Sequence, residues 1–106
     1  MSLSPKNLAD GALTASLVTQ YTAPANTKAI IKAASLCNTS GGAVLVTLTL
    51  NPRTAGSART LIDNRSVADE ETYNCPEVIN HVLEAGGVIQ ASGLNVLFVM
   101  SGVEIV

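Results

Sequence analysis

The residues best suited to metal chemistry are the single histidine, His81, and two glutamates on either side of it. Glu77 lies four positions before His81 and Glu84 three positions after it. A helix over this segment would therefore align one imidazole and two carboxylates on one face, a set that could hold a divalent metal ion. Three residues of these types within eight positions also arise by chance, and a partly exposed polar stripe explains them better. We predict no metal site and no cofactor.

Two cysteines, Cys37 and Cys75, could in principle supply a nucleophile or a disulfide. A catalytic thiol needs a histidine in an electropositive cleft and a group that orients that histidine. Cys75 precedes His81 by six positions, but no orienting group is evident and no Gly-x-Ser-x-Gly motif is present. A disulfide could form if the cysteines face each other, yet nothing indicates an oxidising compartment. We predict two buried free thiols, no catalytic residue and no enzyme activity.

Three further patterns have a structural explanation. The acidic run of residues 69–71 lacks the spaced oxygen ligands of a calcium loop, so we predict a solvated turn. The glycine pairs at 41–42 and 86–87 lack the Lys-Ser/Thr ending of a phosphate loop and are predicted turn glycines. Asn38 and Asn64 match the glycosylation acceptor pattern, which without a secretion signal indicates only polar loops.

The elements that would position these groups are predicted to be short strands separated by turns. Residues 1–10 form an extended or flexible arm, expected to order only on a binding partner, and residues 11–106 form a single domain. Residues 77–83 fit either two helical turns or a strand. The sequence predicts an all-β protein, a small antiparallel β-sandwich or jelly-roll-like fold with seven to eight strands. The predicted strands are residues 13–21, 28–37, 43–50, 59–67, 72–75, 88–92 and 95–106.

Residues 21–50 are the most informative stretch, read as strand, turn and strand. The arms 28–37 and 43–50 are joined by five residues that include two glycines, which predicts a β-hairpin. The second arm alternates, so Val44, Val46, Leu48 and Leu50 are predicted to face the core, with Thr47 and Thr49 toward solvent or a partner. Very little charge lies on either arm, which favours a surface covered by another protein.

A glycine near the middle of the last predicted strand points to a local irregularity. Gly102 predicts a bulge or a close backbone approach within residues 95–106.

Composition narrows the function classes. Of the 106 residues, 47% are hydrophobic and 13% charged, with a net charge of −2, which excludes a disordered chain. Without a basic patch or an aromatic stacking platform, nucleic-acid binding is disfavoured. No run of about 18 apolar residues predicts a membrane span, and the N-terminal residues lack the apolar run of a signal peptide. We expect a protein made in the cytoplasm that binds neither nucleic acid nor membrane.

Three segments of the chain carry a family resemblance: YTAPANTKAIIKAASLCNTSGGAVLVTLTL, RTLIDNRSVADEETYNCPEVINHVLEAGGVIQASG and the ending SGVEIV. Together, over residues 17–106, they resemble small structural proteins encoded by tailed bacteriophages and prophages. The resemblance implies a virion component with a β-sandwich or jelly-roll fold. Small proteins of this type are similar to capsid decoration, or cement, proteins, which bind the outer head shell and clamp neighbouring capsomers. The resemblance assigns no functional residues.

The expected partners are further copies of this chain, as a dimer or trimer, and the phage major capsid protein. Two alternatives stay open, a tail, collar or fibre-attachment protein of the virion and a receptor- or carbohydrate-binding module. Sugar sites usually expose aromatic rings for stacking, whereas this chain has only Tyr21, Tyr73 and Phe98, and Phe98 is predicted to be buried.

Overall fold

A computed structural model describes residues 3–54, 56–76 and 78–106, and every regular element within them is a β-strand. The predicted all-β class is therefore confirmed. Nine strands are present instead of seven to eight, because the N-terminal residues add one and a two-residue strand adds another. They are β1 (Leu3–Ala12), β2 (Val18–Thr22), β3 (Lys28–Asn38), β4 (Val44–Asn51), β5 (Arg59–Val67), β6 (Thr72–Asn74), β7 (Val82–Leu83), β8 (Val88–Ser92) and β9 (Val96–Ile105).

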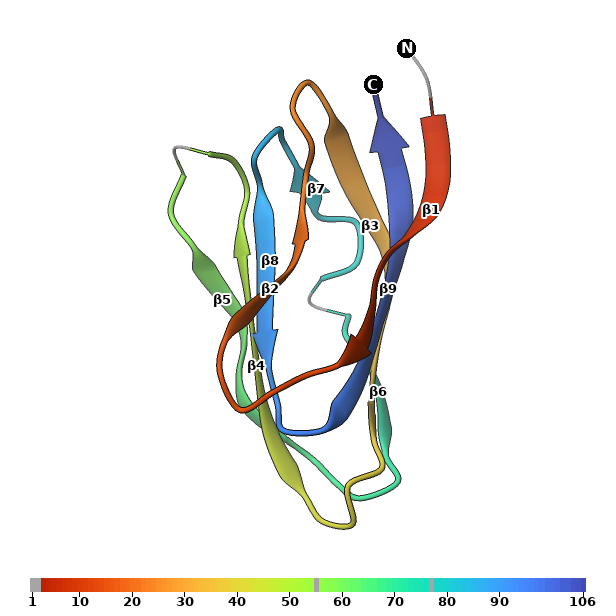
Figure 1. The fold of residues 1–106 in the computed structure, drawn as a ribbon, viewed down its shortest axis with the longest axis vertical. Coiled ribbons are helices and arrows are strands. Elements are labelled where there is room, and N and C mark those ends of the chain that lie inside the picture. Colours follow the sequence, from red (N-terminus) through yellow and green to blue (C-terminus); the bar gives the residue numbers. More distant parts are fainter. Residues whose placement is uncertain (1–2, 55, 77) are drawn as a thin grey trace.

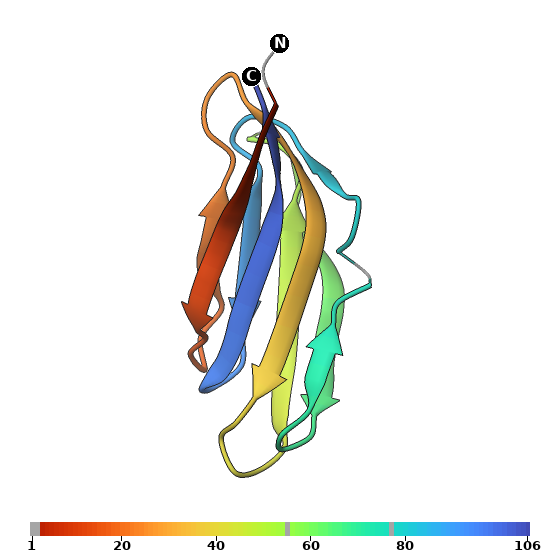
Figure 2. The ribbon, with the colours of Figure 1, turned by 90° about the vertical axis from the view of Figure 1, so that its right-hand side faces the viewer.

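The strands form two antiparallel sheets packed face to face, as Figures 1 and 2 show from two sides. The first sheet has the order β1-β9-β3-β6, with β7 also paired to β3, and the second has the order β2-β8-β4-β5. The sandwich measures 45 × 26 × 19 Å, and its long axis follows the strands. The predicted antiparallel β-sandwich is confirmed.

The strand pairing is nested in the manner of a jelly roll. If β7 is set aside, the first strand pairs with the last (β1 with β9), and further pairs follow inward: β2 with β8, β3 with β6 and β4 with β5. The chain therefore crosses between the sheets at most of its turns. This is the double-sheet arrangement by which all-β proteins fold a long hairpin onto itself.

The core lies between the sheets and is built from alternate residues of each strand, as a period of two requires. In β9 the side chains of Val96, Phe98 and Met100 are fully buried, while Leu97 and Val99 between them face outward. The burial of Phe98 agrees with the prediction from the sequence. Opposite β9, the second sheet contributes Val46, Leu48, Ile62, Ile89 and Ala91.

The predicted hairpin between β3 and β4 is wrong. The two strands occur where expected, but β3 belongs to the first sheet and β4 to the second, so residues 39–43 cross from one sheet to the other. The hydrogen-bonded neighbours of β3 come from far along the chain, chiefly from β9. A glycine-containing turn indicates that the chain reverses direction but not which sheet the next strand joins.

The inward face predicted for β4 is confirmed in its main part. Val46, Leu48 and Leu50 are buried in the core, and Val44 is half-buried at the strand's start. Thr49 differs from the prediction because it is only 8% exposed, although it lies on the outer face between β5 and β8. Neighbouring side chains of a central strand cover it.

The N-terminal segment, expected to be an extended or flexible arm, forms most of β1 where the structure describes it, from Leu3 onward. It pairs with β9 from the Leu3–Ile105 pair to the Ala12–Leu97 pair. Its only buried side chain is Leu8, which is why its alternation is weak in the sequence. Residues 13–21, predicted to be the first strand, are instead a turn followed by β2, because the chain changes sheets after the buried Leu13.

The segment between β6 and β8 forms turns, and the short strand β7 at its end is the only part that fits the strand alternative. A helix over residues 77–83 is not formed in the described part of this segment. Asn80 adopts a left-handed φ of 70°, which an α-helix does not allow. β7 then pairs with β3 through Leu83 and Val82.

Gly102 allows a close backbone approach, as predicted. A Cβ atom at this position would lie 2.2 Å from the backbone oxygen of Ile30 and 2.9 Å from Leu8 Cδ1. The register irregularities next to it lie in the neighbouring strands, between Asn7 and Ala9 in β1 and between Ile31 and Ala33 in β3, not in β9 itself.

Candidate functional site

The residues considered for a metal site are not brought together. His81 is exposed in a turn, and Glu84 is held by Arg53, whose Nε donates to Glu84 Oε2 at 3.3 Å. Glu77, the third member of the predicted set, lies outside the described residues. Among residues 3–54, 56–76 and 78–106 no group of three His, Cys, Asp or Glu side chains is placed to hold a metal ion.

The two cysteines are free thiols, but only one of them is buried, whereas both were expected to be. Cys37 is half-buried and shares the outer face of the sheet with its cross-strand partner Leu97. Cys75 is buried in the core, where its thiol lies 3.8 Å from the carbonyl oxygen of Tyr73.

The acidic run at residues 69–71 stabilises the turn that carries it. Asp69 Oδ1 accepts a hydrogen bond of 3.0 Å from the backbone N–H of Gly41, and Glu71 Oε1 accepts one of 2.7 Å from the N–H of Ala68. The first of these bonds ties two crossing loops together at one end of the sandwich. The predicted solvated turn is therefore an interloop contact as well.

Asn38 is a structural residue that the sequence alone does not identify. Its side chain is fully buried, and Nδ2 donates to the carbonyl oxygens of Gly42 at 2.7 Å and Val67 at 2.8 Å. Its Oδ1 accepts from both the N–H and the hydroxyl of Ser40. Because Nδ2 is enclosed and donates twice, this asparagine is not a glycosylation site in the folded protein.

Each of the three aromatic side chains is buried or covered by another residue of the fold. Phe98 is in the core, and Arg65 lies over the ring of Tyr73, with its guanidinium carbon 3.9 Å from the ring centre. Tyr21 is buried and donates a 2.6 Å hydrogen bond to Glu104 across the two sheets. No aromatic ring in the described residues is presented as an open platform for stacking on a sugar.

The cluster of Tyr21, Glu104 and Lys6 closes the sandwich at the edge formed by β1 and β2. The Glu104 side chain is 12% exposed, and Lys6 Nζ lies 3.3 Å from its Oε1. The hydrogen bond from Tyr21, helped by Lys6, holds the pKa of Glu104 below its ordinary value against the opposing effect of burial. Burial, and then the bond to Glu104, raises the pKa of the Tyr21 hydroxyl above its usual range. These shifts describe a stabilising contact between the sheets.

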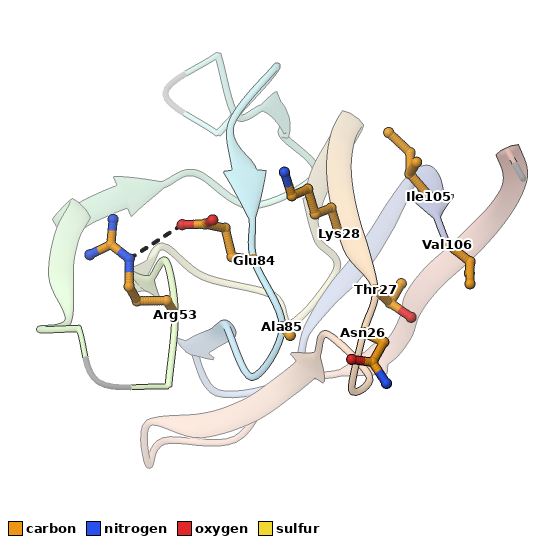
Figure 3. Close-up of a pocket in the computed structure, with 8 residues that line it drawn as sticks. All are labelled: Asn26, Thr27, Lys28, Arg53, Glu84, Ala85, Ile105 and Val106. Atoms are coloured by element: carbon orange, nitrogen blue, oxygen red, sulfur yellow. Dashed lines mark hydrogen bonds and ion pairs between the residues drawn. The ribbon is translucent and has the colours of Figure 1, made fainter. Parts of the chain in front are cut away.

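A hollow of about 800 Å³ lies at the end of the sandwich where β1 begins and β9 ends (Figure 1). Figure 3 shows the Arg53–Glu84 ion pair on one side of it and Ile105 with Val106 on the other. Lys28 lies on its wall. The hollow is widely open to solvent, and its charged lining residues are Lys28 and the paired Arg53 and Glu84.

The most distinctive surface is the outer face of the first sheet, which we call the apolar face. One row of cross-strand partners on it runs from Pro5 in β1 through Val103 and Ile30 to Val82 in β7. Toward the other end of β9, Leu97 and Val99 are 44% and 48% exposed. The apolar face comprises Leu3, Pro5, Ala12, Ile30, Val82, Leu97, Val99, Val103 and Ile105.

The outer face of the second sheet has a different chemistry. Its central rows carry hydroxyl and amide side chains, as in the cross-strand run Thr19–Gln90–Thr49–Thr60. Gln90 donates to Thr19 at 3.2 Å, so part of this polar surface satisfies itself. Leu45, 59% exposed, is the one large aliphatic side chain on β4 that faces outward there. Polar rows also cross the first sheet, as in Asn7–Ser101–Ala33, so its outer face is the more apolar of the two and not uniformly apolar.

The edges of both sheets carry features that discourage strand addition. β1 contains Pro5, Lys6 and an irregular register, and β6 is only three residues long. In the second sheet, β2 and β5 have irregular registers against their neighbours. Proline, charge, bulges and short length are the usual means of protecting an exposed edge. The broad apolar face has no such protection, so it is the candidate functional site.

Comparison with protein-family models, with curated proteins and with solved structures finds no match for this chain. The described residues contain no helix that is both long enough and apolar enough to cross a membrane.

Proposed function

We propose that this chain is a structural protein of a tailed-phage virion, specifically a capsid decoration protein that binds the outer head shell and clamps neighbouring capsomers. The family resemblance of residues 17–106 suggests this role. The observation that carries it is the apolar face, a broad and weakly charged surface left exposed on a domain with protected edges.

An exposed apolar surface of this extent favours association with protein. Its burial contributes roughly 25 cal/mol per Å² before the costs of ordering the partners are subtracted. Monomeric soluble proteins rarely leave large contiguous apolar patches in water, and such patches usually mark interaction sites. The jelly-roll fold alone does not select the role, because viral capsid domains and lectins both use it.

The occupied aromatic rings favour the structural role over carbohydrate recognition. Phe98 and Tyr21 are buried, and Arg65 covers the ring of Tyr73. A glycan-binding module would need at least one ring presented to solvent, or a cleft lined by hydrogen-bonding groups, to orient a sugar.

The proposal is tested by mixing the purified chain with head shells assembled from the capsid protein of the phage that encodes it. Co-sedimentation is expected to show saturable binding, with bound copies in fixed proportion to the capsid protein. Isolated tails of the same phage serve as the second substrate. Binding to tails without binding to shells would transfer the role to a tail, collar or fibre-attachment protein. Absence of binding to both would remove the virion role.

A further inference from the structure

We propose that the apolar face pairs two copies of this chain face to face, about a two-fold axis that lies between the faces and exchanges their ends. This inference rests on the proposed function in one respect, because it names the partner of the apolar face on which that function was proposed. Four observations support a second copy as the occupant, namely the charge pattern, the area, the protected edges and the lack of charge at the centre of the face.

The two charges at the rim of the apolar face lie at opposite corners. Asp10 is the cross-strand partner of Val99 and lies on β1, near one end of the face. Lys28 is the partner of Ile105 and lies on β3, at the other end. Six residues of strand and two strand spacings separate them, or about 20 Å along β9 and about 10 Å across it.

The midpoint between Asp10 and Lys28 falls on β9 near Gly102, at the centre of the face. A two-fold axis that passes there between the faces, perpendicular to the line from Asp10 to Lys28, places Asp10 of each copy opposite Lys28 of the other. Two equivalent ion pairs then flank the apolar contact, as the symmetry of an isologous interface requires. Their attraction fixes the orientation of the copies more than it strengthens the contact.

The centre of the face suits self-pairing because identical groups meet near a two-fold axis. The residues there are Ser101 and Val103 of β9, with Ala33 and Ile30 beside them on β3. None of these four side chains is charged. The nearest charge is that of Lys32, an exposed residue of β3 whose ammonium donates a 3.3 Å hydrogen bond to Asn80 Oδ1, on the segment before β7.

The area of the face matches what a dimer needs. Ten residues along β1, β9 and β3, with five more in the short strands β6 and β7, cover about 550 Å² in projection, from spacings of about 3.3 Å and about 4.8 Å. Side-chain relief raises the accessible area toward the value of about 800 Å² per partner that stable interfaces bury. Because the edges are protected, this area is gained by stacking faces and not by joining strands.

The arrangement also explains how a decoration protein could clamp. The axis lies in the plane of the contact, so one side of the dimer presents equivalent surfaces of both copies in the same direction. Two linked binding surfaces engage two neighbouring capsomers with a higher combined affinity than either surface alone.

The test is sedimentation equilibrium of the purified full-length chain, without shells, together with two variants matched in chemistry. Val99→Glu places a carboxylate on the apolar face, whereas Leu45→Glu makes the same change on the outer face of the second sheet. We expect a wild-type dimer, a dissociation constant raised at least about tenfold by V99E, and an unchanged dimer for L45E. Melting followed by circular dichroism shows whether each variant is folded.

Charge exchange tests the orientation without placing a charge inside the contact. D10K and K28D should each weaken the dimer by bringing like charges together, and the double variant D10K/K28D should restore it.

A wild-type monomer at high concentration, a trimer, or a dimer that L45E disrupts and V99E does not would overturn the proposal. Failure of the double variant to restore pairing would overturn the end-exchanging arrangement. None of these results bears on the shell-binding assay, so the proposed function is judged separately.

Discussion

Gly102 offers a strong test of the fold, because the space beside it is so closely defined. In Gly102→Ala the new Cβ would lie 2.2 Å from the backbone oxygen of Ile30. Carbon–oxygen contacts in sheets are rarely shorter than about 3.3 Å, so β3 and β9 must separate by about 1 Å. Leu8 Cδ1, at 2.9 Å, must move as well.

The expected loss of stability follows from these contacts. Overpacking of this kind costs about 1–3 kcal/mol, and each weakened ladder hydrogen bond adds up to about 1 kcal/mol. Alanine also lowers the conformational entropy of the unfolded chain, which offsets about 0.4–1 kcal/mol of this loss in the free energy of unfolding. We therefore expect the free energy of unfolding of G102A to fall by about 2–3 kcal/mol, which lowers Tm by about 10–15 °C for a domain of this size.

The assay is urea unfolding followed by circular dichroism, at one protein concentration for all variants because dimers melt in a concentration-dependent way. Gly42→Ala is the matched control, since no atom lies within 4 Å of its added Cβ and its φ is not left-handed. It should change the free energy by no more than about 0.5 kcal/mol. If G102A is also within about 0.5 kcal/mol of wild type, the close approach of β9 and β3 is refuted.

Two further predictions concern buried polar groups. Asn38→Ala should destabilise the fold by about 1–3 kcal/mol in the same assay, because it removes the donor of a buried bond to the Val67 carbonyl oxygen and of a half-buried bond to the Gly42 carbonyl oxygen; a loss below about 0.5 kcal/mol would contradict this. Glu104→Gln removes the charge attracted to Lys6 and probes a folded-state pKa that is lowered. Ionised Glu104 therefore stabilises wild type fully above the unfolded value of 4.5, and this advantage over E104Q should shrink as the pH falls below it. A difference in unfolding free energy between wild type and E104Q that does not change with pH would refute this prediction.

The sequence predicted the strands better than their partners. The strand bounds of β5 and β8 agree with the prediction, because turn residues mark the ends of both segments in the sequence. The pairing of β3 with β9 was not predictable, since it joins residues about 60 to 80 positions apart through a jelly-roll topology that no local pattern encodes. The hairpin error has the same origin.

The candidate surface was only partly predictable for a different reason. Both sides of β9 are apolar, so the pattern shows two faces but does not tell which one faces the core. Phe98 and Met100 face inward, while Leu97 and Val99 stay exposed. The shortage of charge in residues 28–50 indicated a covered surface, and β3 does contribute Ile30 to the apolar face. Most of that face comes from β1 and β9, at the two ends of the chain.

An image reconstruction of the intact virion by electron microscopy would show directly whether this chain decorates the head shell. We expect many copies of this jelly roll distributed over the outer head shell, with the apolar face covered by protein. Density confined to a single vertex or to the tail, or an apolar face left open to solvent on every copy, would contradict it.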